Sequence, residues 1–86
     1  MKRVRVTNRV QTIRENTTLM PEGFGGYFAQ NIGTGDVEVD GFVLEPGEQL
    51  DFSHLAPECV WDSPIAVVCR ENGILRITRL QYTVEG

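Results

Sequence analysis

The fold is decided by Tyr27–Phe52, YFAQNIGTGDVEVDGFVLEPGEQLDF, where short runs of alternating apolar and polar residues are separated by turn residues. Val37 and Val39 alternate with acids, as in a half-buried strand. Asp40-Gly41 then fits a two-residue type I′ hairpin turn, and Glu45–Glu48 has proline and glycine where a type II turn requires them. The glycines near residue 34 suit a turn with positive φ. The stretch therefore predicts a β-meander of about four strands.

Strands are also expected before the meander. In the first 15 residues Val4 and Val6 share one parity, whereas Arg3, Arg5 and Arg9 share the other. Because side chains alternate between the two faces of a strand, we expect the valines to point inward and the arginines outward.

The segment after the meander is also strand-like. The nearly all-apolar run Ile65–Cys69 is typical of a central strand, and Ile74–Val84 follows as a long one. Leu75 and Ile77 share one parity, whereas the apolar residues that follow, Leu80, Tyr82 and Val84, share the other. A β-bulge near Thr78 or Arg79 is therefore predicted to turn both groups of side chains toward the core.

No window keeps helical periodicity, and nine glycines and four prolines divide the chain at short intervals. We therefore predict one all-β domain, a small antiparallel β-sandwich (jelly-roll-like, or a partly open barrel) of about seven or eight short strands. Its expected segments are a basic strand region (1–15), an irregular glycine-rich loop (16–26), the meander (27–52), a crossing loop (53–64) and a C-terminal hairpin (65–86).

The length of 86 residues fits a single core, and 41% apolar with 23% charged residues disfavours disorder. Self-association is expected because subunit contacts supplement a thin core. The N-terminal residues lack an apolar signal segment and no run is long enough to span a bilayer, so we expect a protein without membrane contact that is cytoplasmic as synthesised. Cys59 and Cys69 are expected to be reduced and packed as small hydrophobes.

Charge is unevenly distributed. Residues 1–20 carry five basic side chains against one acid, a net charge of +4, while the remaining 66 residues have a net charge of −8. The basic strand could follow a phosphate backbone, but nucleic acid is a poor partner for a chain with a pI near 4.8. Pairing with an acidic face of the same subunit or of a neighbour explains the asymmetry more simply.

The sequence predicts no catalytic, metal or cofactor site. His54 is the only histidine, too few for a zinc or iron centre. Asp51, Ser53 and His54 lie close in sequence, but adjacent residues of a strand point to opposite faces and no nucleophile elbow is present. The acids of the meander are expected to be solvated, and we predict that the chain is not an enzyme.

The segment before the meander, Leu19–Gly26, has two possible structures. It is either a contact loop offering Met20, Phe24 and Tyr27, or a loop folded over its own core. The predicted interaction surface consists of Arg3, Arg5, Arg9, Met20, Phe24 and Tyr27. An alternative function is carbohydrate binding, with Trp61, Tyr27 or Phe24 as a stacking platform.

From Asn31 to Glu48 the chain joins "N-x-G", a short strand, a "[ND]-G" hairpin and "L-x-P-G-E". This pattern resembles small β-sandwich virion proteins of tailed bacteriophages and prophages. The resemblance implies a head-decoration, auxiliary or tail-associated subunit that binds other structural proteins as a multimer, in the virion, with no catalytic residues. We therefore expect a non-enzymatic structural or assembly protein.

Overall fold

The computed structural model of the chain describes residues 3–53 and 60–85, which form eight strands and no helix. The all-β class and the predicted number of strands are confirmed. The strands are β1 (Arg3–Ile13), β2 (Thr17–Leu19), β3 (Gly26–Asn31), β4 (Val37–Val39), β5 (Phe42–Leu44), β6 (Gln49–Phe52), β7 (Ile65–Cys69) and β8 (Leu75–Glu85).

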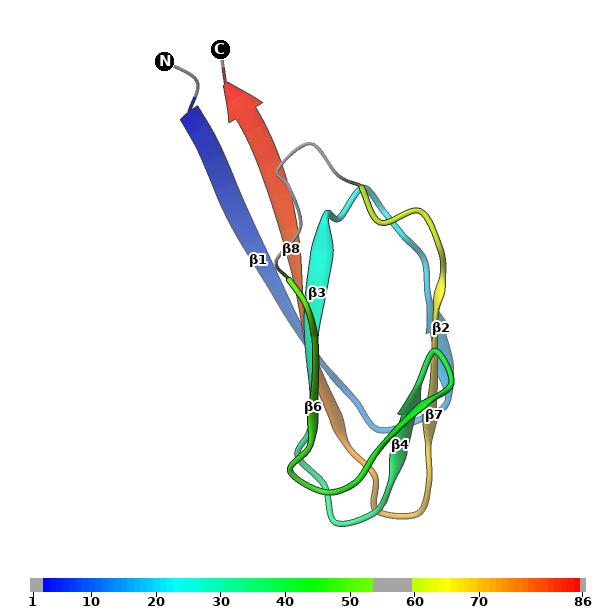
Figure 1. Cartoon of the computed structure of the whole chain (residues 1–86). Coiled ribbons are helices and arrows are strands. Elements are labelled where there is room, and N and C mark those ends of the chain that lie inside the picture. The colour runs from blue at the N-terminus through cyan, green and yellow to red at the C-terminus, as the bar shows by residue number, and fades with distance from the viewer. Residues whose placement is uncertain (1–2, 54–59, 86) are drawn as a thin grey trace.

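The strands form two antiparallel four-stranded sheets, in the orders β1-β8-β3-β6 and β2-β7-β4-β5, which face each other as a β-sandwich (Figure 1). The core between them takes alternate residues from the central strands, as the two-residue period of a strand dictates. Its most deeply buried apolar members are Tyr27, Ala29, Val37, Val39, Ile65, Val67, Leu75 and Ile77. Full burial of each larger aliphatic side chain stabilises the fold by roughly 1.5–3 kcal/mol.

Two of the three turns predicted in the decisive stretch are present as expected. Asp40 has φ 51° and Gly41 φ 86°, the two positive values that a type I′ turn requires. Gly47 also has φ 86°, and the Glu48 amide donates to the Glu45 carbonyl at 2.9 Å, as expected of a type II turn. Local turn chemistry therefore places the end of β4, both ends of β5 and the start of β6.

The predicted meander is wrong, because β3 is not paired with β4. β3 lies between β8 and β6, and the β4–β5 hairpin belongs to the opposite sheet. The loop between β3 and β4 crosses between the sheets and packs on the β7–β8 loop, where the amides of Thr34 and Gly35 donate to the Asn72 carbonyl at 2.9 and 3.0 Å. Gly35 serves this close approach rather than a positive φ, since a Cβ there would overlap the Glu71 carbonyl oxygen.

The predicted C-terminal hairpin is also wrong. β7 and β8 follow each other in the chain but lie in different sheets, and β8 pairs with β1 and β3. β6 and β7 likewise lie in different sheets, although most of the segment joining them, 54–59, is outside the described residues.

No bulge interrupts β8. Its pairing with β1 runs without a break from Arg3 opposite Glu85 to Ile13 opposite Leu75. Leu80 therefore stays on the face of the sheet opposite to Ile77. The prediction that a bulge turns the apolar residues from Leu80 onward toward the core is wrong.

Asn31, buried completely at the end of β3, connects three segments. Its Nδ2 donates to the carbonyls of Gly35 at 2.8 Å and Leu44 at 2.9 Å, and its Oδ1 accepts from the Gly33 amide at 2.9 Å. The asparagine and glycine of the "N-x-G" pattern thus have a structural role. They fix the crossing loop against the end of β5.

Past the end of β3, β1 and β8 pair only with each other, and the Tyr82 hydroxyl of β8 donates to the Ser53 carbonyl at 2.9 Å. β3 accompanies β8 only as far as Gly26, which is opposite Leu80, so residues 3–7 and 81–85 form a two-stranded ribbon, here called the arm. The arm continues one sheet past the rest of the sandwich and carries the two ends of the chain (Figure 1). It contributes to the elongated shape of 48 × 20 × 17 Å.

Candidate interaction surface

The side of the sandwich formed by β1 and β2 has a long open strand edge. β1 is the end strand of its sheet over 11 residues, so one row of its backbone amides and carbonyls has no neighbouring strand among residues 3–53 and 60–85. Every described side chain from Arg5 to Val10 is exposed. A long unpaired edge without proline or bulge is a template for pairing with another polypeptide.

β1 also exposes apolar side chains, which reverses the predicted orientation of this strand. Val6 is 54% and Val10 59% exposed. Arg9, by contrast, is opposite Arg79 on the face that continues into the core. The inward orientation predicted for Val6 is therefore wrong. Val10 shares its outward parity, which differs from that of the buried Ile13.

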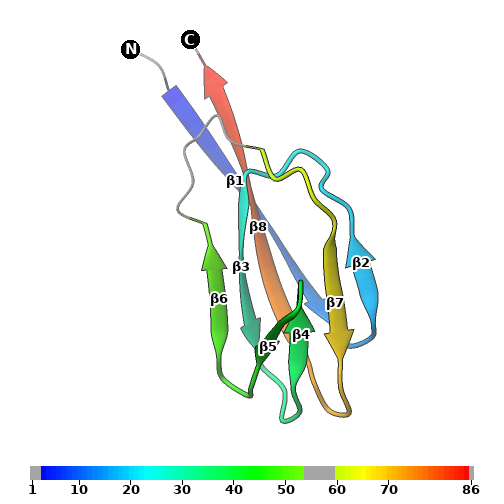
Figure 2. The ribbon, with the colours of Figure 1, turned by 45° about the vertical axis from the view of Figure 1, so that its right-hand side comes forward.

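The opposite side of the sandwich is formed by β5 and β6, which Figure 2 shows across from β1 and β2. Here Phe42 is 52% and Val43 54% exposed. Residues 40–53 contain four acids and no basic residue. The two sides thus share exposed apolar side chains but differ in the sign of their charge.

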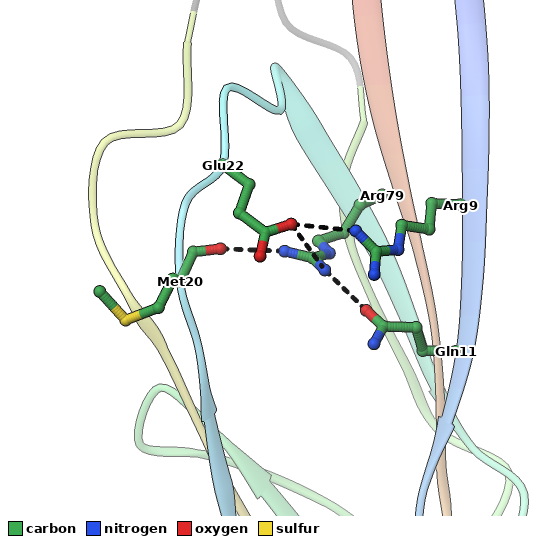
Figure 3. A network of polar contacts seen from close by, with 5 residues as sticks. All are labelled: Arg9, Gln11, Met20, Glu22 and Arg79. Atoms are coloured by element: carbon green, nitrogen blue, oxygen red, sulfur yellow. Dashed lines mark hydrogen bonds and ion pairs between the residues drawn. The ribbon is translucent and has the colours of Figure 1, made fainter.

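A polar network fixes the β2–β3 loop to the base of the arm (Figure 3). Arg9 Nη1 donates to Glu22 Oε2 at 2.9 Å. Arg79 Nη1 donates to the Met20 carbonyl at 2.9 Å, and Arg79 Nη2 donates to Gln11 Oε1 at 2.7 Å and lies 3.9 Å from Glu22 Oε2. The loop is therefore bound to both β1 and β8.

Arg79 is buried, with an exposed fraction of only 3%. Desolvation by burial lowers the pKa of its guanidinium, the charge of Arg9 acts in the same direction, and Glu22 opposes both. Its other contacts are the ring of Phe24, 4.3 Å from Arg79 Cζ, and two oxygen acceptors. The group is a structural cation that holds the loop in place.

The aromatic side chains pack against one another. Tyr27 and Phe24 are buried, with 1% and 7% exposed, and the rings of Tyr27 and Trp61 meet edge to face at 5.0 Å between centroids. The loop is folded over its own core at Phe24 and Tyr27, the second of the two structures considered above. Neither residue presents a ring face on which a sugar could stack.

The six residues of the predicted interaction surface are not brought together. Arg5 and Arg9 lie along β1, and Met20 is 57% exposed at the loop. Arg3 lies in β1 by its backbone. Phe24 and Tyr27 belong to the interior. β1 therefore keeps its place as a candidate surface, while the loop contributes Met20.

Sequence reasoning missed several residues of the candidate surface. The alternation predicts Val6 to point inward, and it makes no surface prediction for Val10, Phe42 or Val43, although all four are more than half exposed. One signal was present. Val6 and Val10 share one parity along β1, and the buried Ile13 has the other.

Few side chains among the described residues are arranged for metal binding or catalysis. No three His, Cys, Asp or Glu side chains among them gather as metal ligands. Ser53 donates from its amide and hydroxyl to Asp51 Oδ1, a local contact at the end of β6, while His54 and Cys59 lie outside the described residues. Cys69 is free, and desolvation by burial raises its thiol pKa.

An open depression of about 470 Å³ lies beside the β1–β2 turn, lined by residues 11–17 and Leu19. The space between Phe24, Tyr27, Trp61 and Arg79 is closed and admits no water-sized group.

The described part of the chain contains no helix that is long and apolar enough to cross a membrane. Comparison of the whole sequence and structure with protein-family models, curated proteins and solved structures gave no match.

Proposed function

We propose that this chain is a non-enzymatic structural subunit that acts through protein–protein contacts made by β1 and the arm. The observation that carries the proposal is the edge of β1, which runs for 11 residues with Val6 and Val10 exposed on it. A two-stranded ribbon is at best marginally stable in water by itself. Covering it with another protein removes its apolar side chains from water and pairs its free backbone groups.

The proposed setting is an assembly of the kind formed by virion proteins of tailed bacteriophages. Its support is the resemblance of the turn-rich stretch to such proteins, together with the role of Asn31 in joining the turns of that stretch. In this setting the sandwich is a rigid base, and the arm reaches a neighbouring structural protein.

The test is co-expression of the tagged full-length chain with the proteins encoded by the genes that flank it. A stoichiometric complex with a structural protein is expected on size-exclusion chromatography. Val6→Asp places an uncompensated charge in the contact and should abolish the complex. Val60→Asp is the matched control, because Val60 is 62% exposed and lies outside β1.

Circular dichroism and melting of both variants verify that they are folded. The proposal is overturned if the purified chain binds none of these proteins, or if Val6→Asp and the control bind equally well.

A further inference from the structure

We infer that the partner of the β1 side is the β5–β6 side of a second copy of this chain, in a head-to-tail contact. This inference rests on the proposed function and names one partner for the surface. It is argued from three properties of the two sides: strand direction, charge and exposed apolar area.

Strand direction makes the two ends of each sheet complementary. All neighbouring strands in the β1-β8-β3-β6 sheet are antiparallel, so β1 and β6 run in opposite directions. The same holds for β2 and β5 in the other sheet. A second copy in the same orientation therefore presents β6 antiparallel to β1, and the sheet can continue from one subunit into the next.

Charge favours this pairing over a contact between two β1 strands. Residues 3–19, from β1 to β2, contain four arginines against one glutamate, a net charge of +3, and Glu22 offsets part of the charge of Arg9. Residues 40–53, around β5 and β6, have a net charge of −4. A contact between two β1 edges places like charges together, whereas the head-to-tail contact places opposite charges together.

Exposed apolar side chains occur on both sides. Val6 and Val10 on β1 and Phe42 and Val43 on β5 are each more than half exposed. Val6 and Val10 lie on the outer face of one sheet, and Val43 lies on the outer face of the other. In a contact between β1 and the β5–β6 side, these groups flank the paired edges and lose part of their contact with water. Because the two surfaces differ, the contact is heterologous and generates a closed ring or a filament.

The experiment uses two full-length variants, each changed on one side. Val10→Glu puts a carboxylate on the basic side, and Val43→Arg puts a guanidinium on the acidic side. Val60→Glu and Val60→Arg are the matched controls, since Val60 lies on neither β1 nor β5. Native mass spectrometry and sedimentation velocity measure the assemblies, and circular dichroism confirms the fold.

The wild-type chain and both controls should assemble, less so at high salt because ions screen the charges. Each side variant alone should lose assembly. An equimolar mixture should regain complexes that contain both variants in equal numbers, because one variant keeps an intact β1 side and the other an intact β5–β6 side. This complementation is specific to a head-to-tail contact.

Two results would overturn the inference. A wild-type chain that stays monomeric at high concentration removes the second copy as a partner. A Val43→Arg variant that still assembles while Val10→Glu does not assigns the contact to two β1 strands. In either case the proposed function is tested separately. Its test is whether the chain forms a complex with the products of the flanking genes and whether Val6→Asp abolishes that complex.

Discussion

The guanidinium carbon of Arg79 lies 4.3 Å from the centroid of the Phe24 ring, with both side chains buried between β8 and the β2–β3 loop. A planar cation on a ring face combines electrostatic attraction with apolar contact. The same guanidinium donates to the Met20 carbonyl and to Gln11. The base of the arm is therefore held by one side chain that contacts the loop and β1 together.

Arg79→Lys should destabilise the fold by about 2 kcal/mol, because a single ammonium cannot reproduce the stacked plane and the two separate donors, and the part-buried acceptors on Met20 and Gln11 then lose their partners. Arg76→Lys, at an exposed position of the same strand, should change stability by less than about 0.5 kcal/mol. Urea unfolding followed by circular dichroism measures both. Equal effects of the two substitutions would show that the Phe24 and Met20 contacts do not stabilise the loop.

The sequence predicts the parts of this fold that depend on local chemistry. Asp40-Gly41 and Pro46-Gly47 act within four residues, so their turns follow from side-chain type alone. The partners of the strands depend on distant segments. The Gly33–Asp36 loop could close a hairpin or cross between sheets, and it crosses because its backbone packs on the β7–β8 loop about 35 residues later.

The candidate surface was harder to predict for a related reason. Alternation along β1 shows that its valines and arginines lie on opposite faces, but not which face leads to the core. The default assignment of valine to the interior fails because Val6 and Val10 lie on the face of β1 opposite to that of the buried Ile13. Arg79 is the converse case, a charged residue whose burial is made possible by a loop distant in sequence.

Asn31→Asp should destabilise the protein by about 3 kcal/mol or more. It replaces an amide that donates to the Gly35 and Leu44 carbonyls with a buried oxygen that faces them, which leaves both acceptors unpaired and brings a charge into the interior. Asn16→Asp is the control, because the Asn16 oxygen accepts from the Cys69 amide and an aspartate keeps that bond. Chemical denaturation of the two variants compares them, and a similar loss in both would contradict the role assigned to Asn31.

Tyr27→Phe tests the alkaline stability of the core. Desolvation by burial, assisted by the negative charge of Asp40, raises the pKa of Tyr27 to about 12 from 10.0. The unfolded chain therefore loses this proton first as the pH rises, so the contribution of the neutral phenol is complete below pH 10 and is lost between pH 10 and about 12. The Tyr27 hydroxyl has no hydrogen-bond partner among the described residues.

Removing that hydroxyl should consequently change the free energy of unfolding at pH 7 by less than about 1 kcal/mol, and should reduce the loss of stability on the alkaline side. Thermal melting of the wild type and of Tyr27→Phe at neutral pH and at pH values between 10 and 12 measures the difference. As the pH rises, the melting temperatures of the wild type and of Tyr27→Phe should converge, or cross so that Tyr27→Phe melts at the higher temperature. Parallel curves for the two proteins would mean that the Tyr27 phenol does not limit alkaline stability.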